Sequence, residues 1–234
     1  MKNFILVDFR IDSKEKNTLV NLGYEVLLCP PCNNLYDAVL GHPDMLLNII
    51  DKNTIILNKD MNSSFIRILK NLNYKVLLSD SLVGSKYPYD IILNAVNTKE
   101  VFVHYLDYTD KSLLNSLGNK KIINVKQGYT KCSTAVVTDS AFITSDKGIY
   151  NSLIKENFDV LLVPSGDILL PSLDYGFIGG TCGLIEKNTM AFYGSLDYYK
   201  YGEEVKEFLR KHNVKPLYLR EGKLIDRGSI LKLG

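Results

Sequence analysis

The stretch NSSFIRILKNLNYKVLLSD, residues 62–80, combines two periodicities. Its first half places apolar residues three and four positions apart, which gives one apolar face of an amphipathic helix. Its second half, YKVLLS (74–79), is rich in β-forming residues and predicts a short strand. The stretch therefore predicts a helix that leads directly into a strand, and the fold depends on whether the chain repeats this unit.

The same helix-then-strand pattern occurs four more times along the chain. The matching stretches are residues 13–29, 110–125, 150–164 and 202–219. Each copy is followed by a loop and then by two short strands, which are separated by turn sequences such as DKNT (51–54). The copies recur every roughly 40 to 55 residues, a period typical of repeat and propeller proteins.

The two ends of the chain complement each other. The fifth copy keeps the strands VKPLYL (214–219) and SILKL (229–233) and then stops, whereas the strand FILVDF (4–9) and a helix from about Asp12 to Gly23 stand at the start. Pairing the ends would close a ring and remove exposed sheet edges. A linear α/β array or a doubly wound parallel sheet is the alternative. The strand pairs are too close for helical crossovers, which favours hairpins and mixed sheets.

Composition limits the possible partners. The 234 residues are 46% hydrophobic, with a net charge of +2 and no cluster of lysines and arginines. These values do not indicate binding to nucleic acid or to an anionic membrane. No apolar run reaches the roughly 18 residues that a membrane helix needs, and the N-terminus lacks a signal-peptide pattern. We therefore expect a cytoplasmic protein with reduced cysteines and neither nucleic acid nor a membrane as its partner. The oligomeric state is left open.

Two residues stand out as candidates for chemistry. His42 lies in the loop GHPDM (41–45), beside an acid and between apolar runs, whereas His104 falls in a predicted strand and His212 at a predicted helix end. Cys132 follows a glycine-containing loop and would react as a thiolate, which needs a nearby cation, base or helix N-terminus. The structural alternatives are a hydrogen-bonded turn at His42 and a buried, inert thiol at Cys132.

Two other cysteine motifs offer alternative chemistry. CPPC (29–32) has the spacing of a redox pair or of half a zinc site, but its prolines and the polar residues that follow predict a loop, and no second such motif completes a tetrad. A metal shared by Cys29, Cys32 and His42 is a weak alternative. GGTCG (179–183) predicts close backbone approach and contains Cys182, a rival nucleophile. We predict neither a metal site nor a cofactor.

Five strand-rich modules with one helix each resemble the pentein fold, the α/β-propeller of arginine deiminases, agmatine deiminases, dimethylargininases and amidinotransferases. Three loops carry the resemblance, namely GHPDM (41–45), DIILNAV (90–96) and QGYTKCSTAVV (127–137). The resemblance implies one α/β-propeller domain over residues 1–234, with pseudo-fivefold symmetry and a ring closed by its terminal segments. It also implies a module order circularly permuted relative to these enzymes.

The resemblance assigns roles to individual residues. In the family's His-x-Asp motif the histidine is the general acid/base and the aspartate holds the guanidinium, which here implies His42 and Asp44. The family's nucleophile corresponds to Cys132. Asn94 matches an asparagine that follows a strand in dimethylargininases and is an expected substrate-binding residue.

The last two modules depart from the family pattern. Gly180 in DYGFIGGTCGLI (174–185) stands where the family has an aspartate, and in GKLIDRGSILKL (222–233) Asp226 keeps the family's acid while Ser229 replaces a second aspartate. Gln127 also stands where dimethylargininases have an acid. Asp167, in SGDILLP, is an alternative source of the carboxylate missing at Gly180.

Two functions follow from this pattern. The first is a thiol-dependent hydrolase or transferase of the guanidino-modifying type. It would use Cys132 as nucleophile and His42 as general acid/base on an amidine- or guanidine-like small molecule other than free arginine. The second is a non-catalytic pentein binding module, which the missing acids favour. The first requires Cys132 and His42 to face one cavity.

Overall fold

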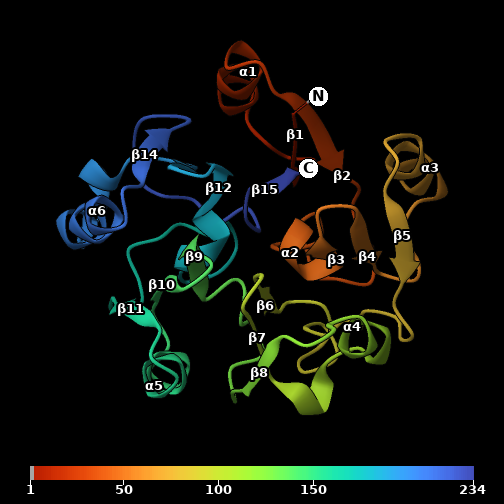
Figure 1. Ribbon diagram of the computed structural model, residues 1–234. Helices are drawn as coiled ribbons and strands as arrows, with labels where there is room; N and C mark the ends of the chain where they lie inside the picture. The colour runs from red at the N-terminus through yellow and green to blue at the C-terminus, as the bar shows by residue number, and fades with distance from the viewer. Residues whose placement is uncertain (1–2) are drawn as a thin grey trace.

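The computed structural model describes residues 3–234 as a mixed α/β structure with five three-stranded sheets. The sheets are arranged around a common centre, with the helices between their strands at the periphery (Figure 1). Within residues 3–234 no helix has the length and apolar character needed to cross a membrane.

Each sheet is one module with the same internal order. A first strand pairs antiparallel with a middle strand, and a helix then returns the chain to a third strand that runs parallel to the middle one. The elements of the five modules are β15 (Leu231–Leu233), β1 (Phe4–Asp8), α1 (Ser13–Asn21) and β2 (Glu25–Cys29); β3 (Leu47–Asp51), β4 (Thr54–Leu57), α3 (Ser63–Asn71) and β5 (Lys75–Leu78); β6 (Val96–Asn97), β7 (Val101–His104), α4 (Lys111–Asn115) and β8 (Lys121–Asn124); β9 (Thr134–Thr138), β10 (Ala141–Thr144), α5 (Lys147–Lys155) and β11 (Asp159–Leu162); and β12 (Cys182–Glu186), β13 (Thr189–Phe192), α6 (Gly202–Lys211) and β14 (Lys215–Tyr218).

Short helical elements lie between the modules or within their connections. They are α2 (Pro43–Leu46) and the 3₁₀ helices η1 (Leu106–Tyr108), η2 (Ile178–Thr181) and η3 (Leu196–Tyr198). The expected helices, hairpins and mixed sheets are therefore present, and the alternative of one doubly wound parallel sheet is wrong.

The two ends of the chain share one sheet. β15 pairs antiparallel with β1, with Phe4 opposite Leu233 and Leu6 opposite Leu231. β1 is thereby the middle strand of its sheet, flanked by β15 and β2, as the complementary ends of the sequence predicted. The first module is therefore assembled from both ends of the chain.

Four of the five main helices begin, and all five end, by a repeated device. The side chains of Asp12, Asn62, Asp110 and Asp146 accept hydrogen bonds from the free backbone N–H groups at four helix starts. Beyond every helix end lies a glycine or asparagine in the left-handed region, which reverses the chain into the third strand. These residues are Gly23, Asn73, Gly118, Asn157 and Asn213.

Close backbone packing at the centre depends on glycine. A Cβ atom on Gly179 would overlap the carbonyl oxygens of Lys131 and Thr134, and one on Gly183 would overlap the carbonyl of Ile230. These contacts bring β12 against β9 and β15, which belong to neighbouring modules. The close approach predicted for GGTCG is confirmed.

Replacing Gly183 by alanine is therefore expected to destabilise the fold. Because the added methyl group meets backbone rather than a movable side chain, Gly183→Ala should lower the free energy of unfolding by about 1–3 kcal/mol. Urea unfolding followed by circular dichroism measures the change. The matched control is Gly148→Ala in α5, where the nearest atom is the side-chain oxygen of Asp146 at 3.0 Å. Equal midpoints for the two variants would contradict the packing argument.

Candidate active site

The loops that enter the first strands meet around a cavity of about 250 Å³. Three of the residues singled out in the sequence line it, namely His42, Cys132 and Asp226. They precede β3, β9 and β15, so three different modules contribute one side chain each. The requirement that His42 and Cys132 face one cavity is therefore met by the geometry.

His42 is a buried imidazole held in a tight turn. The backbone N–H of His42 donates to the carbonyl of Val39 at 3.0 Å, and α2 begins at the next residue, Pro43. The backbone of Gly228, which has a φ of +71°, packs on this side chain so closely that a Cβ there would overlap the Cβ of His42. The imidazole is thus fixed by backbone from a distant part of the chain.

Two carboxylates flank the imidazole of His42. Its Nδ1 lies 3.8 Å from Asp226 Oδ1, and its Nε2 lies 3.9 Å from Asp8 Oδ2. Both separations exceed hydrogen-bond length, and Nδ1 has no hydrogen-bond partner among the described residues. This unpartnered nitrogen leaves a hydrogen-bonding position for a ligand that enters the cavity.

The sequence did not single out Asp8 or its partner Arg10. Asp8 ends the buried strand β1 and is itself buried, and its carboxylate accepts hydrogen bonds from the guanidinium and the backbone N–H of Arg10. Arg10 also donates to the carbonyls of Asp37 and Ala38, just before the loop that holds His42. An acid at the end of a fully apolar strand was the available signal, because such a group requires a partner.

Cys132 is a buried thiol in polar surroundings. Its Sγ lies 3.4 Å from Asp44 Oδ1 and accepts a hydrogen bond from Asn94 Nδ2 at 3.0 Å. Burial raises the pKa of the Cys132 thiol well above its usual value, and the carboxylates of Asp44 and Asp226 raise it further. The Asn94 hydrogen bond and the charge of Lys131 act in the opposite direction. At neutral pH the free protein therefore holds Cys132 as a thiol.

Asn94 joins three loops at the centre of the site. Its amide nitrogen donates to the carbonyl of Asp44 at 2.9 Å as well as to Cys132 Sγ, and its amide oxygen accepts from the backbone N–H groups of Lys131 and Cys132. These interactions hold Asn94 behind the cavity wall, which Cys132 lines and Asn94 does not. Asn94 therefore holds the thiol in place, and its contact with a substrate stays a prediction.

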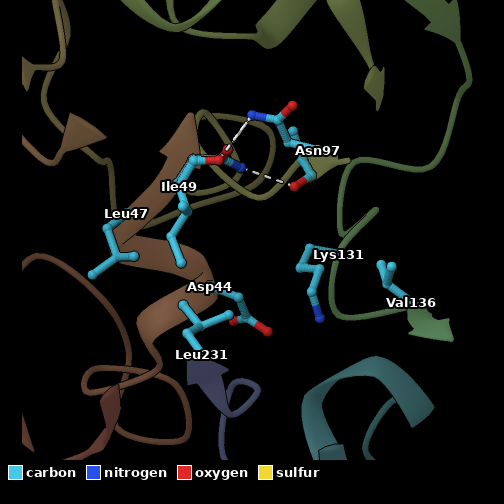
Figure 2. A pocket seen from close by; sticks show the side chains of 9 residues that line it. Asp44, Leu47, Ile49, Asn97, Lys131, Val136 and Leu231 are labelled. Atoms are coloured by element: carbon cyan, nitrogen blue, oxygen red, sulfur yellow. Dashed lines mark hydrogen bonds between the residues drawn. The ribbon is translucent and has the colours of Figure 1, made fainter. Parts of the chain in front are cut away.

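Asp44 does not line the cavity that contains His42. Its carboxylate contacts Cys132 through Oδ1, and Ser229 Oγ lies 2.6 Å from Oδ2. The same side chain lines a second, smaller cavity of about 100 Å³ together with Lys131. Figure 2 shows the Asp44 carboxylate and the Lys131 ammonium pointing into this second cavity. Asp44 thus lies between two cavities.

Lys131 supplies a half-buried positive charge near Asp44. Its ammonium donates to Ser229 Oγ at 2.8 Å and contacts the carbonyl of Gly179 at 3.3 Å. Ser229 therefore links the lysine to the carboxylate, at the position where the family pattern has an aspartate. A hydroxyl between an ammonium and a carboxylate gives each of the two charges a hydrogen-bond partner.

Asp226 places a carboxylate in the main cavity. It accepts hydrogen bonds from the backbone N–H groups of Phe177 at 2.9 Å and Gly228 at 3.0 Å. Burial raises the pKa of this carboxyl, the nearby imidazole of His42 lowers it, and Asp44 raises it. Gly180 packs directly on this carboxylate, and a Cβ there would overlap its oxygen atoms. Gly180, which stands where the pentein pattern has an aspartate, therefore leaves room for the carboxylate of Asp226.

Asp167 does not supply the missing carboxylate. Its oxygens bind the ammonium of Lys223 at 2.6 Å and the backbone N–H of Lys200 at 2.8 Å, and the residue does not line the cavity. The backbone turns at Gly166 and Asp167, which both have positive φ, and this directs Asp167 toward those lysines. Gln127 is also engaged elsewhere, because its amide donates to Asp146 at 3.1 Å.

The remaining cysteines and histidines have structural surroundings. Burial raises the pKa of Cys182 to about 11, and this thiol does not line the cavity. Cys29 ends strand β2 and Cys32 lies in the loop that follows, both as free thiols. His104 is buried between Thr109 and Gly128, and burial lowers its pKa to about 4. Residues 3–234 contain no group of three or more His, Cys, Asp or Glu side chains arranged to hold a metal ion.

Comparison of the sequence with protein families identifies one match, over residues 6–231. The chain belongs to DUF6873. This family is described as a family of unknown function. No curated protein matches the chain in sequence.

Solved structures of guanidino-modifying enzymes share the fold. An agmatine deiminase from C. jejuni aligns with 99% of this chain and 93% of its own, with a TM-score of 0.59 and 11% identity. The amidinotransferase SxtG from Microseira wollei aligns with 93% of this chain and 88% of its own (TM-score 0.57, 10% identity). A dimethylargininase from Pseudomonas aeruginosa aligns with 93% of this chain and 92% of its own (TM-score 0.54, 10% identity). The pentein resemblance is thereby confirmed for the fold, and the permuted module order stays a prediction.

The surroundings of Cys132 predict how its reactivity depends on pH. Because a negative charge on Asp44 opposes the thiolate, Asp44→Asn should lower the pKa of Cys132 and move its alkylation profile to lower pH. A decrease of about one pKa unit would speed alkylation at pH 8 about tenfold. The rate of iodoacetamide labelling at Cys132, followed by peptide mass spectrometry, measures this. Asp167→Asn, outside the cavity, should leave the profile unchanged, and a shift toward higher pH in Asp44→Asn would contradict the argument.

Proposed function

We propose that this protein is a thiol-dependent hydrolase or transferase of the guanidino-modifying type. It acts on an amidine- or guanidine-like small molecule other than free arginine, with Cys132 as nucleophile, His42 as general acid/base and Asp226 as the carboxylate that binds the cation. The observation that carries the proposal is that these three side chains, from three modules, line one cavity. A nucleophile, a proton carrier and a charged anchor in one cavity fit this type of reaction.

The proposed reaction has two stages. The proton of the Cys132 thiol passes to His42, and Sγ forms a bond to the amidino carbon. The bond from that carbon to the leaving nitrogen breaks, and the imidazolium of His42 protonates the departing amine. In the second stage a water, or an acceptor amine in a transferase, attacks the carbon and gives its proton to His42. The carbon–sulfur bond then breaks and the thiol is regenerated.

Bound substrate is expected to activate the thiol. In the free protein, burial and two carboxylates hold the pKa of Cys132 above its usual value. A guanidinium or amidinium cation in the cavity brings a positive charge close to Sγ, which favours the thiolate. The nucleophile would therefore form when a cation is bound.

The neighbours with this fold support a small nitrogen compound as the ligand. One of the dimethylargininase structures contains citrulline, and the agmatine deiminase structure contains its substrate. Two features argue against free arginine here. Gly180, Gln127 and Ser229 lack the acids of the family pattern, and Asp44 is already hydrogen-bonded to Ser229.

The fold part of the proposal is a closed five-module propeller that forms one domain over residues 1–234. Support comes from the pairing of β15 with β1 and from the five sheets arranged around a common centre (Figure 1). Closure of this kind holds the loops that carry His42, Cys132 and Asp226 at fixed positions relative to one another.

A non-catalytic binding module is the second candidate. The observation that favours it is the contact between Cys132 Sγ and Asp44 Oδ1, because a carboxylate at 3.4 Å opposes formation of the thiolate. In this case the cavity would bind a cationic ligand, and Cys132 would serve only to pack the centre.

Cation-directed labelling tests the proposed function. Cys132 should react faster with 2-chloroacetamidine than with the neutral 2-chloroacetamide, by about tenfold or more, since Asp226 attracts the cation. His42→Ala and Asp226→Asn should abolish this preference, whereas His212→Ala, outside the cavity, should retain it. Site-resolved mass spectrometry measures the rates. Similar reaction rates for all four cysteines, or an unreactive Cys132, would overturn the catalytic proposal.

A second measurement separates catalysis from binding. Release of amine or ammonia is followed for a panel of amidines and guanidines, and Cys132→Ala is expected to lose turnover while still binding the cations. Thermal stabilisation by the same compounds reports binding in the variant. Undiminished turnover in Cys132→Ala would exclude the sulfur as nucleophile, and binding without turnover in the wild-type protein would favour the binding module.

A further inference from the structure

The wall of the main cavity is apolar and largely aromatic. Apolar side chains from three regions of the chain form most of it, including Tyr36, Tyr129, Leu170, Leu173, Tyr175 and Phe177. Four ionisable or nucleophilic residues complete it, namely His42, Cys132, Asp174 and Asp226. No lysine or arginine of residues 3–234 lines this cavity.

The aromatic side chains present carbon surfaces to the ligand. The rings of Tyr129 and Phe177 are stacked with centroids 6.0 Å apart, and Tyr175 meets Phe177 edge-on at 6.2 Å. The hydroxyl of Tyr129 donates to Asp90 at 2.6 Å, so the polar end of this side chain is already engaged. Ring faces arranged in this way suit an aromatic group and also attract a delocalised cation.

The carboxylates of the cavity lack a permanent counter-ion. Asp8, behind His42, is paired with the guanidinium of Arg10, but Asp226 receives only two backbone N–H groups and faces His42. Asp174 adds an exposed acid to the cavity wall. Both acids of this cavity therefore favour a cation and repel an anion.

Two lysines of the surrounding loops are directed elsewhere. Lys131 precedes the nucleophile, but its ammonium binds Ser229 and Gly179 and points into the second cavity (Figure 2). Lys223 binds Asp167. A ligand carboxylate in the main cavity would thus find aromatic carbon and two acids but no lysine or arginine, so its desolvation would be poorly compensated.

We propose that the ligand of this cavity joins an amidinium or guanidinium group to an aromatic or similarly apolar frame that carries no carboxylate. This inference rests on the proposed function of the same site and specifies its substrate class. The cationic group lies at Asp226 and Cys132, and the apolar frame lies against Tyr129, Tyr175 and Phe177. Amino-acid guanidines are rejected by charge, and Asp174 is one determinant of that rejection.

Three amidines of graded structure test the inference. Benzamidine should bind at least about tenfold more tightly than acetamidine, which lacks the aromatic frame, and at least about tenfold more tightly than 4-carboxybenzamidine, which adds the anion. Isothermal titration gives the affinities for the wild-type protein and for Cys132→Ser. Protection of Cys132 from 2-chloroacetamide places the compounds in this cavity.

A charge reversal at the cavity wall provides the matched variant. Asp174 is exposed, so Asp174→Lys is expected to fold normally and to reduce the preference of benzamidine over 4-carboxybenzamidine by about tenfold. Glu207→Lys, on the peripheral helix α6, makes the same change in net charge away from the cavity and should leave the preference intact.

The outcomes distinguish this inference from the proposed function. Equal affinities for benzamidine and 4-carboxybenzamidine, tighter binding of acetamidine, or no binding of any of the three would overturn the substrate class. The proposed function is judged separately by the labelling of Cys132 with 2-chloroacetamidine, a compound small enough to need no aromatic wall. Selective labelling together with equal affinities would retain the enzyme and reject this inference.

Discussion

The site depends on close packing at the centre of the molecule, where backbone contacts backbone and side chains directly. Gly179 and Gly183 bring β12 against its neighbours, Gly180 admits the carboxylate of Asp226, and Gly228 packs on His42. Without a side chain at these four positions, loops from separate modules approach closely enough to surround one small cavity. Any larger residue there would separate the groups that the proposed chemistry needs together.

The repeated architecture could be predicted because its signals are local. Helical periodicity, turn residues and an incomplete fifth copy each depend on short stretches, and they predicted the modules and the pairing of the chain ends. His42 and Cys132 also emerged from the sequence, because a polar residue in an apolar stretch and a cysteine after a glycine-containing loop are visible without a structure. Their meeting in one cavity was a requirement of the function that the pentein resemblance implied, and these local signals alone do not give it.

The rest of the site depends on contacts between distant segments, which periodicity does not encode. Arg10 pairs with Asp8 because a turn directly follows β1, and Asp44 lies beyond the cavity wall because one turn of α2 directs it toward Ser229. Asp167 was expected in the cavity, but two positive-φ residues direct it to Lys223. The aromatic wall was also missed, since Tyr129 and Phe177 are far apart in the chain and meet only through folding.

The third strand of every module lies at an edge of its sheet, where a strand of another molecule could pair with it. Five modules present five outer strands, which are the places where unrelated chains add strands and aggregation starts. Each of these strands is only four or five residues long, and all five begin with a charged residue, namely Glu25, Lys75, Lys121, Asp159 and Lys215. Short edges with a charge at one end are poorer templates for strand addition than long apolar edges.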